Sequence, residues 1–372
     1  QTCALPILKA LVLGGTGFIG RNLVKMLVDS DEYSFVRSVD KVFPETAYLS
    51  KEHAAVYDNA EKCVFVQGNL VNAASINKMF TIDGGFDVVF DCAAETKLGQ
   101  DEFMYEQKTH QLTKMVAEEA LKQKVKKFIH LSNAQVYDSS SKPKDENAKI
   151  KPWTRLAVSQ AKADEDLLAM KDLPVVILRP AMTYGPGDVS GIAPRIICAA
   201  VYKYTKKKME FLWTGDMKLN TVHVRDVCRA MIHCAKADSK IERGTIFNLC
   251  DKNDTTQKKI NAILEEIFQI KTGFKGTLIS TAAEKLGFDG VCETVNDEHM
   301  KPWSQLCKEE NLVGTPLSPY LDQELLYNNP YCINGSAIEA TGFTYSEPVM
   351  TTDLIREEIK YFSDQKLFPN YA

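Results

Sequence analysis

The feature that most constrains the fold is a glycine-rich segment near the start of the chain, Leu11–Gly20 (LVLGGTGFIG). Its glycines Gly14, Gly17 and Gly20 follow an apolar run typical of a buried strand and precede an amphipathic run typical of a helix. In that context the first glycine permits a tight turn, the second admits a pyrophosphate, and the third lets helix and sheet pack closely. The free N–H groups at the helix start attract phosphate. The segment therefore predicts a dinucleotide-binding turn; a glycine-rich turn that binds nothing is the other interpretation.

An acidic residue at the end of the next expected strand bears on the choice of cofactor. Asp40 follows Phe35–Val39, where a carboxylate accepts hydrogen bonds from the adenosine ribose hydroxyls. A carboxylate at this position also repels the extra phosphate of NADP. We therefore expect NAD, with NADP as the alternative because Lys41 and Arg37 stand nearby.

Short apolar runs alternate with helical patterns along the first half of the chain. Strands are expected at Lys9–Leu13, Phe35–Val39, Val64–Gln67, Val88–Cys92, Lys127–Ser132 and Pro174–Arg179, and helices at Phe18–Leu27, Gln111–Lys122 and Trp153–Met170. This alternation implies right-handed βαβ units, and hence an α/β fold with a Rossmann-type doubly wound parallel sheet.

The second half of the chain has a less regular pattern. Helices are expected at Ile192–Tyr204, Asp226–Ala235, Thr256–Ile270 and Thr351–Phe362, and a strand at Thr245–Leu249. We predict a dinucleotide-binding domain over residues 8–182. A smaller, interleaved α+β lobe would cover residues 183–372, with some of its chain returning to the sheet. Lys271–Tyr331 shows no clear periodicity; its aromatic residues suit either a lid or partner surface, or a loop that fills its own small core.

Composition excludes several classes of protein. The net charge of −4 argues against nucleic acid as the main partner, and no apolar run has the length of a membrane span. The ten cysteines include no C-x-x-C pair and the six histidines are dispersed, so we expect no metal site and a reducing intracellular compartment. The cytoplasm is favoured, with an organelle matrix as the alternative. Gln1–Ile7 resembles translated adapter sequence, so a targeting peptide upstream of these residues would not be visible in the sequence.

Further segments resemble the extended short-chain dehydrogenase/reductase family, which includes NAD-dependent epimerases and dehydratases. They are Gln67–Leu70, Phe86–Ala94, Leu131–Tyr137, Leu178–Asp188 (LRPAMTYGPGD) and Thr221–Asp226 (TVHVRD). Together with Asp40 and the glycine-rich segment, the resemblance implies a set of cofactor-binding residues: Gly14, Thr16, Gly17, Phe18, Ile19, Gly20, Asp40, Asn69, Leu70, Ala93, Ala94 and Pro180.

The resemblance also gives these residues roles. Asn69 and Leu70 would meet the adenine, Ala93 and Ala94 would line the path to the nicotinamide, and Pro180 would flank the nicotinamide amide. Asn69 stands where the family usually has Asp, a mild change because an amide can also recognise adenine. We align Thr109 with a buried Asn of the family, which calls the local backbone support into question.

The catalytic positions of the family are all altered. The family uses a Ser/Thr, a Tyr and a Lys, because a phenolate acts as the base and a nearby ammonium lowers its pKa. Here Asn133, Leu156 and Gln160 stand at those three positions. A shifted alignment that uses Lys162 puts Val158 at the tyrosine position. Neither register supplies the ordinary general base.

Three functions therefore compete. One is a cofactor binder acting as a structural subunit, dinucleotide sensor or scaffold, which the altered triad favours. The second is an active NAD-dependent epimerase/dehydratase or hydroxy-dehydrogenase with a nucleotide-sugar or sterol-like substrate. Its displaced acid–base group would come from Tyr137, Tyr184, Lys162 or His223, although each of these also has an ordinary structural explanation. The third is an interaction module that binds no nucleotide. Expected partners are a dinucleotide, a small-molecule substrate, and a homodimer mate or larger complex.

Overall fold

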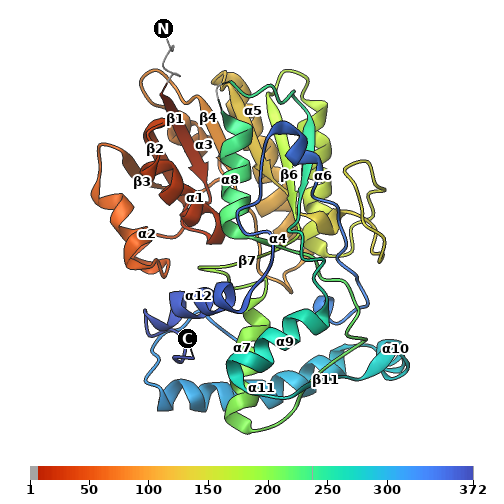
Figure 1. The fold of residues 1–372 in the computed structure, drawn as a ribbon. Coiled ribbons are helices and arrows are strands. Elements are labelled where there is room, and N and C mark those ends of the chain that lie inside the picture. The colour runs from red at the N-terminus through yellow and green to blue at the C-terminus, as the bar shows by residue number, and fades with distance from the viewer. Residues whose placement is uncertain (1–6, 237, 372) are drawn as a thin grey trace.

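The centre of the molecule is a seven-stranded sheet in which every strand pair is parallel, in the order β10-β6-β5-β4-β1-β2-β3 (Figure 1). The computed structural model describes residues 7–236 and 238–371, so Gln1–Pro6 of the adapter-like segment lies outside the described residues. The strands are β1 (Leu8–Leu13), β2 (Tyr33–Asp40), β3 (Cys63–Gln67), β4 (Val88–Asp91), β5 (Lys127–Leu131), β6 (Val175–Pro180) and β10 (Thr245–Leu249). The predicted doubly wound parallel sheet is confirmed.

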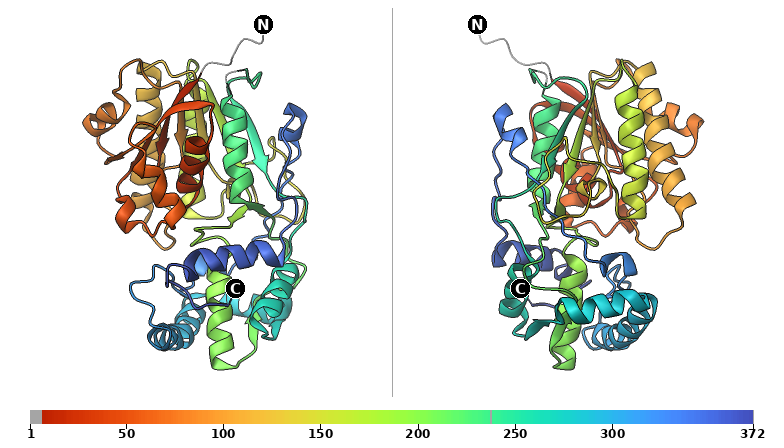
Figure 2. Two further views of the ribbon diagram at one scale, coloured as in Figure 1. Left: turned by 60° about the vertical axis from the view of Figure 1, so that its left-hand side comes forward. Right: turned by 90° about the vertical axis from the view of Figure 1, so that its right-hand side faces the viewer.

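Helices cover both faces of this sheet. On one face α1 (Phe18–Asp29) packs against α8 (Val224–Ala235); the other face carries α3 (Ala73–Phe80), α5 (Leu112–Lys122) and α6 (Arg155–Ala169) (Figures 1 and 2). The short helices α2 (Lys51–Ala55) and α4 (Glu102–Tyr105) lie in connections, and a π-helical segment, Glu106–Gln111, leads into α5.

Strand β1 shows why the sheet is buried on both sides. Its side chains alternate between the faces, so Ala10 and Val12 join one hydrophobic core while Leu11 and Leu13 join the other. All four are fully buried. A strand covered on both faces reads as a continuous apolar run, which is the pattern seen in the sequence.

The remaining elements form a mostly helical lobe beside the sheet (Figure 2). They are α7 (Ala193–Thr205), α9 (Gln257–Phe268), α10 (Gly276–Leu286), α11 (Asp289–Glu309) and α12 (Thr352–Ser363), with two small parallel pairs, β7 (Met182–Tyr184) with β9 (Thr221–His223) and β8 (Met209–Phe211) with β11 (Thr272–Phe274). Between these elements the chain returns to the sheet through α8 and β10. The division at residue 183 stays a prediction.

The segment Lys271–Tyr331 differs from its predicted irregular form. It contains α10 and the long helix α11, so that prediction was wrong. The residues of α11 that are buried have helical spacing: Cys292, Asn296, His299, Trp303 and Leu306. Two of them, Asn296 and His299, are polar. A hydrophobic pattern could not reveal this face, and Pro302 within the helix further disguised it.

Three findings apply to the described part of the chain. None of its helices combines the length and the apolar character needed to cross a bilayer. Its nine cysteines are all free thiols, and none of its His, Cys, Asp and Glu side chains gather in threes as a metal would require. The cellular compartment stays a prediction.

Candidate functional site

A cavity of about 940 Å³ lies between the carboxyl ends of the sheet strands and the lobe. This volume is at the upper end of the range for ligand sites, and in doubly wound sheets ligands bind at this edge. All of the cofactor-binding residues implied by the sequence line it: Gly14, Thr16, Gly17, Phe18, Ile19, Gly20, Asp40, Asn69, Leu70, Ala93, Ala94 and Pro180. The three altered triad residues line the same cavity.

The glycine-rich turn closes so tightly that side chains are excluded at two of its positions. Gly14 has φ +76°, and a Cβ there would lie 2.8 Å from the carbonyl oxygen of Cys92. A Cβ on Gly20 would lie 2.0 Å from the carbonyl oxygen of Gly14. Helix α1 begins at Phe18 without a side-chain cap, so its first N–H groups are suited to an external anion such as pyrophosphate.

Asp40 is held at the edge of this turn. Its Oδ2 accepts from the Thr16 N–H and its Oδ1 from the Val42 N–H, each at 3.1 Å. Of the two nearby cations, Arg37 points elsewhere, because its Nη1 donates to the carbonyls of Met79 and Thr81. Lys41 lines the cavity. Two backbone N–H groups therefore hold the Asp40 carboxylate at the position expected for the ribose. Arg37 does not offset the negative charge of Asp40, because its side chain points elsewhere.

The region expected to receive the adenine is formed by loops after β3 and β4. Asn69 lines the cavity, and its Oδ1 accepts from the Val71 N–H at 3.2 Å. Thr109 is buried, and its Oγ1 accepts from the Glu95 N–H at 3.2 Å. The Thr109 hydroxyl therefore supports the loop after β4, at the position where the sequence put backbone support in question.

The three altered triad positions meet at the cavity wall. The Asn133 amide donates to Gln160 Oε1, while Asn133 Oδ1 accepts from the Gln135 N–H at 2.7 Å. Leu156 lies one turn before Gln160 on α6 and also lines the cavity. In the other register, Val158 is exposed and Lys162 pairs with a carboxylate of the π-helical segment. Neither borders the cavity, so the first alignment is the one that places its residues at the site.

None of the four displaced acid–base candidates lines the cavity. Tyr137 Oη donates to Asn248 Oδ1 at 2.8 Å and accepts from an Arg179 nitrogen at 3.0 Å. Tyr184 and His223 are buried edge to face, with ring centroids 5.0 Å apart. Burial raises the pKa of Tyr184 and lowers the pKa of His223 to about 3.

Lys162, the fourth candidate, donates through its Nζ to Glu106 Oε2 at 3.0 Å. It therefore forms an ion pair between α6 and the π-helical segment. The structure places all four candidates in packing or surface contacts, which are the ordinary explanations that the sequence also allowed.

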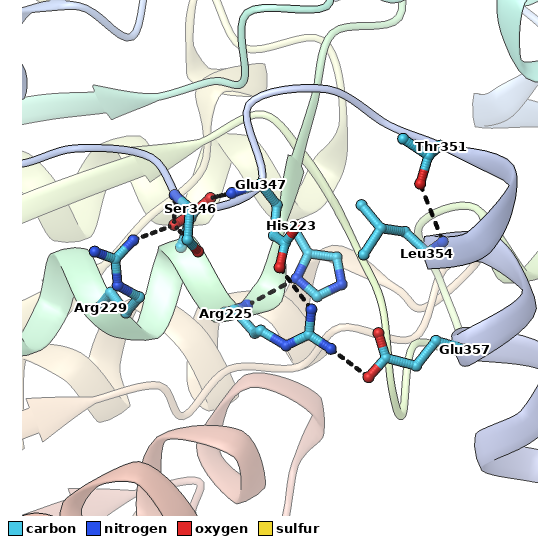
Figure 3. A network of polar contacts seen from close by, with 9 residues as sticks. His223, Arg225, Arg229, Ser346, Glu347, Thr351, Leu354 and Glu357 are labelled. Atoms are coloured by element: carbon cyan, nitrogen blue, oxygen red, sulfur yellow. Dashed lines mark hydrogen bonds and ion pairs between the residues drawn. The ribbon is translucent and has the colours of Figure 1, made fainter.

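The family-like segment Thr221–Asp226 joins the sheet region to the end of the chain (Figure 3). Arg225 donates to Glu347 Oε1 at 2.7 Å and also to Glu357 of α12. Asp226, which is fully buried, accepts from the Glu347 N–H at 2.8 Å. His223, Arg225 and Asp226 do not border the cavity. Their contacts instead hold α12 and the segment before it against α8.

Sequence reasoning missed one arginine at the cofactor end of the cavity. Arg21, in the first turn of α1, donates to the carbonyls of Thr16, Ala47 and Tyr48 and to the hydroxyl of Tyr361 on α12. It thereby joins the glycine-rich turn to the lobe. Ala47, Tyr48 and Tyr361 lie 26, 27 and 340 residues away in sequence, so no local pattern marked these contacts.

One tyrosine of the cavity wall was also missed as a site residue. Tyr331 Oη donates to the Pro180 carbonyl at 3.1 Å, and its ring meets the edge of Trp153 with centroids 6.0 Å apart. Burial raises the pKa of Tyr331. The sequence marked it only as one of several aromatics in Lys271–Tyr331.

Comparison with known proteins identifies the family. Residues 10–250 match the NAD dependent epimerase/dehydratase family. The chain belongs to this family. It is 27% identical to human dTDP-D-glucose 4,6-dehydratase over 323 residues, which cover 84% of this chain and 85% of that one. It is 24% identical to an uncharacterized UDP-glucose epimerase of Bacillus subtilis, covering 86% and 98% of the two chains.

Solved structures share the fold. UDP-glucuronic acid 4-epimerase from Bacillus cereus, in complex with UDP-glucuronic acid and NAD, superposes with a TM-score of 0.69 at 20% identity, over 96% of this chain and 99% of that one. A dTDP-glucose 4,6-dehydratase from Streptomyces venezuelae with NAD bound gives 0.70 at 18% identity, over 96% and 98%. The fold of family members therefore extends through the lobe of this chain.

Proposed function

We propose that the chain binds NAD along the carboxyl edge of the sheet and has lost the proton transfer of its family. The observation that carries this proposal is the contact between Asn133 and Gln160 beside Leu156, all three at the cavity wall. Two amides and an alkyl side chain do not exchange protons near neutral pH. The chain would then serve as a structural subunit, a dinucleotide sensor or a scaffold.

The residues present fit a dinucleotide. The lack of a Cβ at Gly14 and Gly20 lets the turn and the start of α1 pack against neighbouring backbone, and Asp40 is fixed at the position expected for the ribose hydroxyls. Asn69 and Leu70 would receive the adenine. NAD, when bound, would supply a hydride acceptor. NAD in the related structures named above supports the same choice over NADP.

An active enzyme is the second candidate, and Tyr331 is the observation that favours it. It is the cavity-lining tyrosine whose hydroxyl contacts Pro180, the residue expected beside the nicotinamide. Because burial raises its pKa, Tyr331 would act as a proton donor in a reduction rather than as a phenolate base. The small-molecule substrate would be a nucleotide sugar, as the names of the relatives suggest, or a sterol-like alcohol. A homodimer or larger complex stays a prediction.

The test combines bound-ligand analysis with turnover. The purified protein is denatured and released nucleotides are identified by mass spectrometry; the protein is also assayed with NAD and dTDP-glucose, UDP-glucose or a 3β-hydroxysteroid. We expect bound NAD and no turnover above background. A rate that survives Leu156→Ala and disappears in Tyr331→Phe would establish the active enzyme instead. Failure to bind either dinucleotide would leave only an interaction module.

A further inference from the structure

The lobe contributes the cation Arg195 to the cavity wall. The surroundings of Arg195 differ from those of the other cations that line the cavity. Arg195, in the first turn of α7, borders the cavity. Its Nη2 donates to Gln257 Oε1 at 2.9 Å, and its guanidinium carbon lies 4.7 Å from the centre of the Phe211 ring. Gln257 Nε2 donates to the carbonyls of Leu212 and Thr214, both at 3.1 Å. The amide is therefore oriented so that its oxygen faces the arginine.

The charge of Arg195 has no acidic partner. Among residues 7–236 and 238–371 it forms no ion pair, and its buried Nη1 has no hydrogen-bond partner. Asp188, the nearest acidic residue in sequence, instead accepts from four backbone N–H groups of residues 190–193. Burial lowers the pKa of Arg195 to about 10, so the guanidinium remains charged at neutral pH. A buried charge without a counter-charge destabilises a fold, and a ligand that supplies the counter-charge removes this cost.

Lys275 provides the contrast within the same cavity. Its Nζ forms an ion pair with Glu210, which also pairs with Lys208 at 3.3 Å. Lys275 therefore already has a carboxylate partner, which it shares with Lys208. Many of the other side chains with which the lobe lines the cavity are apolar, among them Met209, Phe211, Trp213, Met217, Val291 and Leu326.

We propose that the lobe side of the cavity binds a largely apolar molecule with a single carboxylate, which pairs with Arg195. The apolar body would contact the lobe side chains, and the carboxylate would accept charge-assisted hydrogen bonds from the guanidinium. A nucleoside diphosphate carries more than one negative charge. In this part of the lobe Arg195 is the one cation without a carboxylate partner among the described cavity-lining residues, so a single carboxylate matches it better. The inference extends the proposed function, because this molecule would lie beside the dinucleotide.

Binding of decanoate, measured by isothermal titration calorimetry, tests the proposal. Decanamide has the same chain without the charge, and UDP serves as the nucleoside diphosphate probe. The variants are Arg195→Met and, as a matched control, Lys275→Met, which removes the cation that has a carboxylate partner. We expect decanoate to bind the wild type and the control alike, and to bind Arg195→Met about 10- to 100-fold more weakly. Decanamide should bind every variant as weakly as decanoate binds Arg195→Met.

Two results would overturn the proposal. One is decanoate binding that Arg195→Met does not weaken. The other is UDP binding that depends on Arg195 while decanoate does not bind, which would identify a nucleoside diphosphate as the occupant. NAD binding is measured in every variant. Its absence from all of them would refute the proposed function, whereas NAD binding without decanoate binding would refute only this inference.

Stability without ligand gives an independent measurement. Removal of an uncompensated buried charge should raise the urea midpoint of Arg195→Met above that of the wild type. Lys275→Met should leave the midpoint unchanged or lower it slightly, because it breaks an existing ion pair. A lower midpoint for Arg195→Met, with unchanged decanoate affinity, would assign the arginine a structural role and overturn the proposal.

Discussion

The side-chain amide of Asn133 donates to the amide oxygen of Gln160, two residues that the resemblance aligns with the hydroxyl and the ammonium group of the family. Asn133 is also fixed by the Gln135 N–H, and Gln160 is buried on α6. The two side-chain amides therefore satisfy one another at the cavity wall. The loss of acid–base chemistry that we propose rests on this contact.

Restoration of the triad should therefore create activity. The triple variant Asn133→Ser, Leu156→Tyr and Gln160→Lys places a phenol and an ammonium at the cavity wall. General acid–base catalysis typically contributes about 10²- to 10⁴-fold, so we expect NAD-dependent turnover of a UDP- or dTDP-sugar at least about 10²-fold above wild type. The matched control is Val158→Tyr, which creates the same Tyr-to-Lys spacing with Lys162. It should stay inactive, and higher activity in this control would show that the alignment is in the wrong register.

Much of this site could be predicted from the sequence because the relevant signals are local. The turn at Gly14–Gly20 is encoded by residues within one βα unit, as are Asn133 and the helix that carries Leu156. Each lines the cavity. Steric requirements at the turn, such as the 2.0 Å separation between a Cβ on Gly20 and a backbone oxygen, leave few alternatives to glycine. Such requirements appear in the sequence as glycines at fixed positions.

The parts that could not be predicted depend on contacts between distant segments. Tyr331 reaches Pro180 across 151 residues of chain, and Arg21 reaches Tyr361 across 340. Arg195 looked like an ordinary residue of an amphipathic helix, because the lack of a counter-charge appears only in three dimensions. The buried face of α11 includes Asn296 and His299, so hydrophobic periodicity gave no signal for that helix.

NAD should stabilise the protein more than NADP, and Asp40 should be the cause. A ligand that binds only the folded state raises the melting temperature, and at a given concentration the rise is larger for tighter binding. The carboxylate disfavours the additional phosphate of NADP, so Asp40→Asn, which keeps an acceptor for the Thr16 N–H, should reduce the difference between the two shifts. Differential scanning fluorimetry with each dinucleotide measures this. Equal shifts in the wild type would remove the argument from Asp40.

Gly20→Ala should abolish dinucleotide binding. The new Cβ would lie 2.0 Å from the Gly14 carbonyl oxygen, so α1 must move away from the turn that receives the pyrophosphate. We expect a loss of about 1–3 kcal/mol in the free energy of unfolding, the usual cost of overpacking. Gly290→Ala is the control: a Cβ at this position of α11 meets no atom within 4 Å. It should be neutral or slightly stabilising, since alanine favours helix. Retained NAD affinity in Gly20→Ala would contradict the role of the turn.

Protonation of His223 should make the protein less stable at acid pH. Burial lowers its pKa in the fold to about 3 from an ordinary 6.5, so the histidine is neutral when folded and takes up a proton on unfolding at lower pH. The stability that it contributes is complete above about pH 6.5 and is lost as the pH falls towards 3. At pH 5 the loss is about 2 kcal/mol relative to neutral pH. Urea unfolding at pH 7 and pH 5 measures it.

The comparison that isolates His223 uses one variant at the end of β9 and one on helix α8. In His223→Asn the amide oxygen can still accept from the Arg225 N–H, but it cannot be protonated, so the drop in stability between pH 7 and pH 5 should be smaller than in the wild type. His233→Asn alters a partly exposed histidine whose Nε2 lies 2.7 Å from Thr341 Oγ1, and it should keep most of the wild-type drop. If the two variants show the same pH dependence, the acid sensitivity arises elsewhere in the fold.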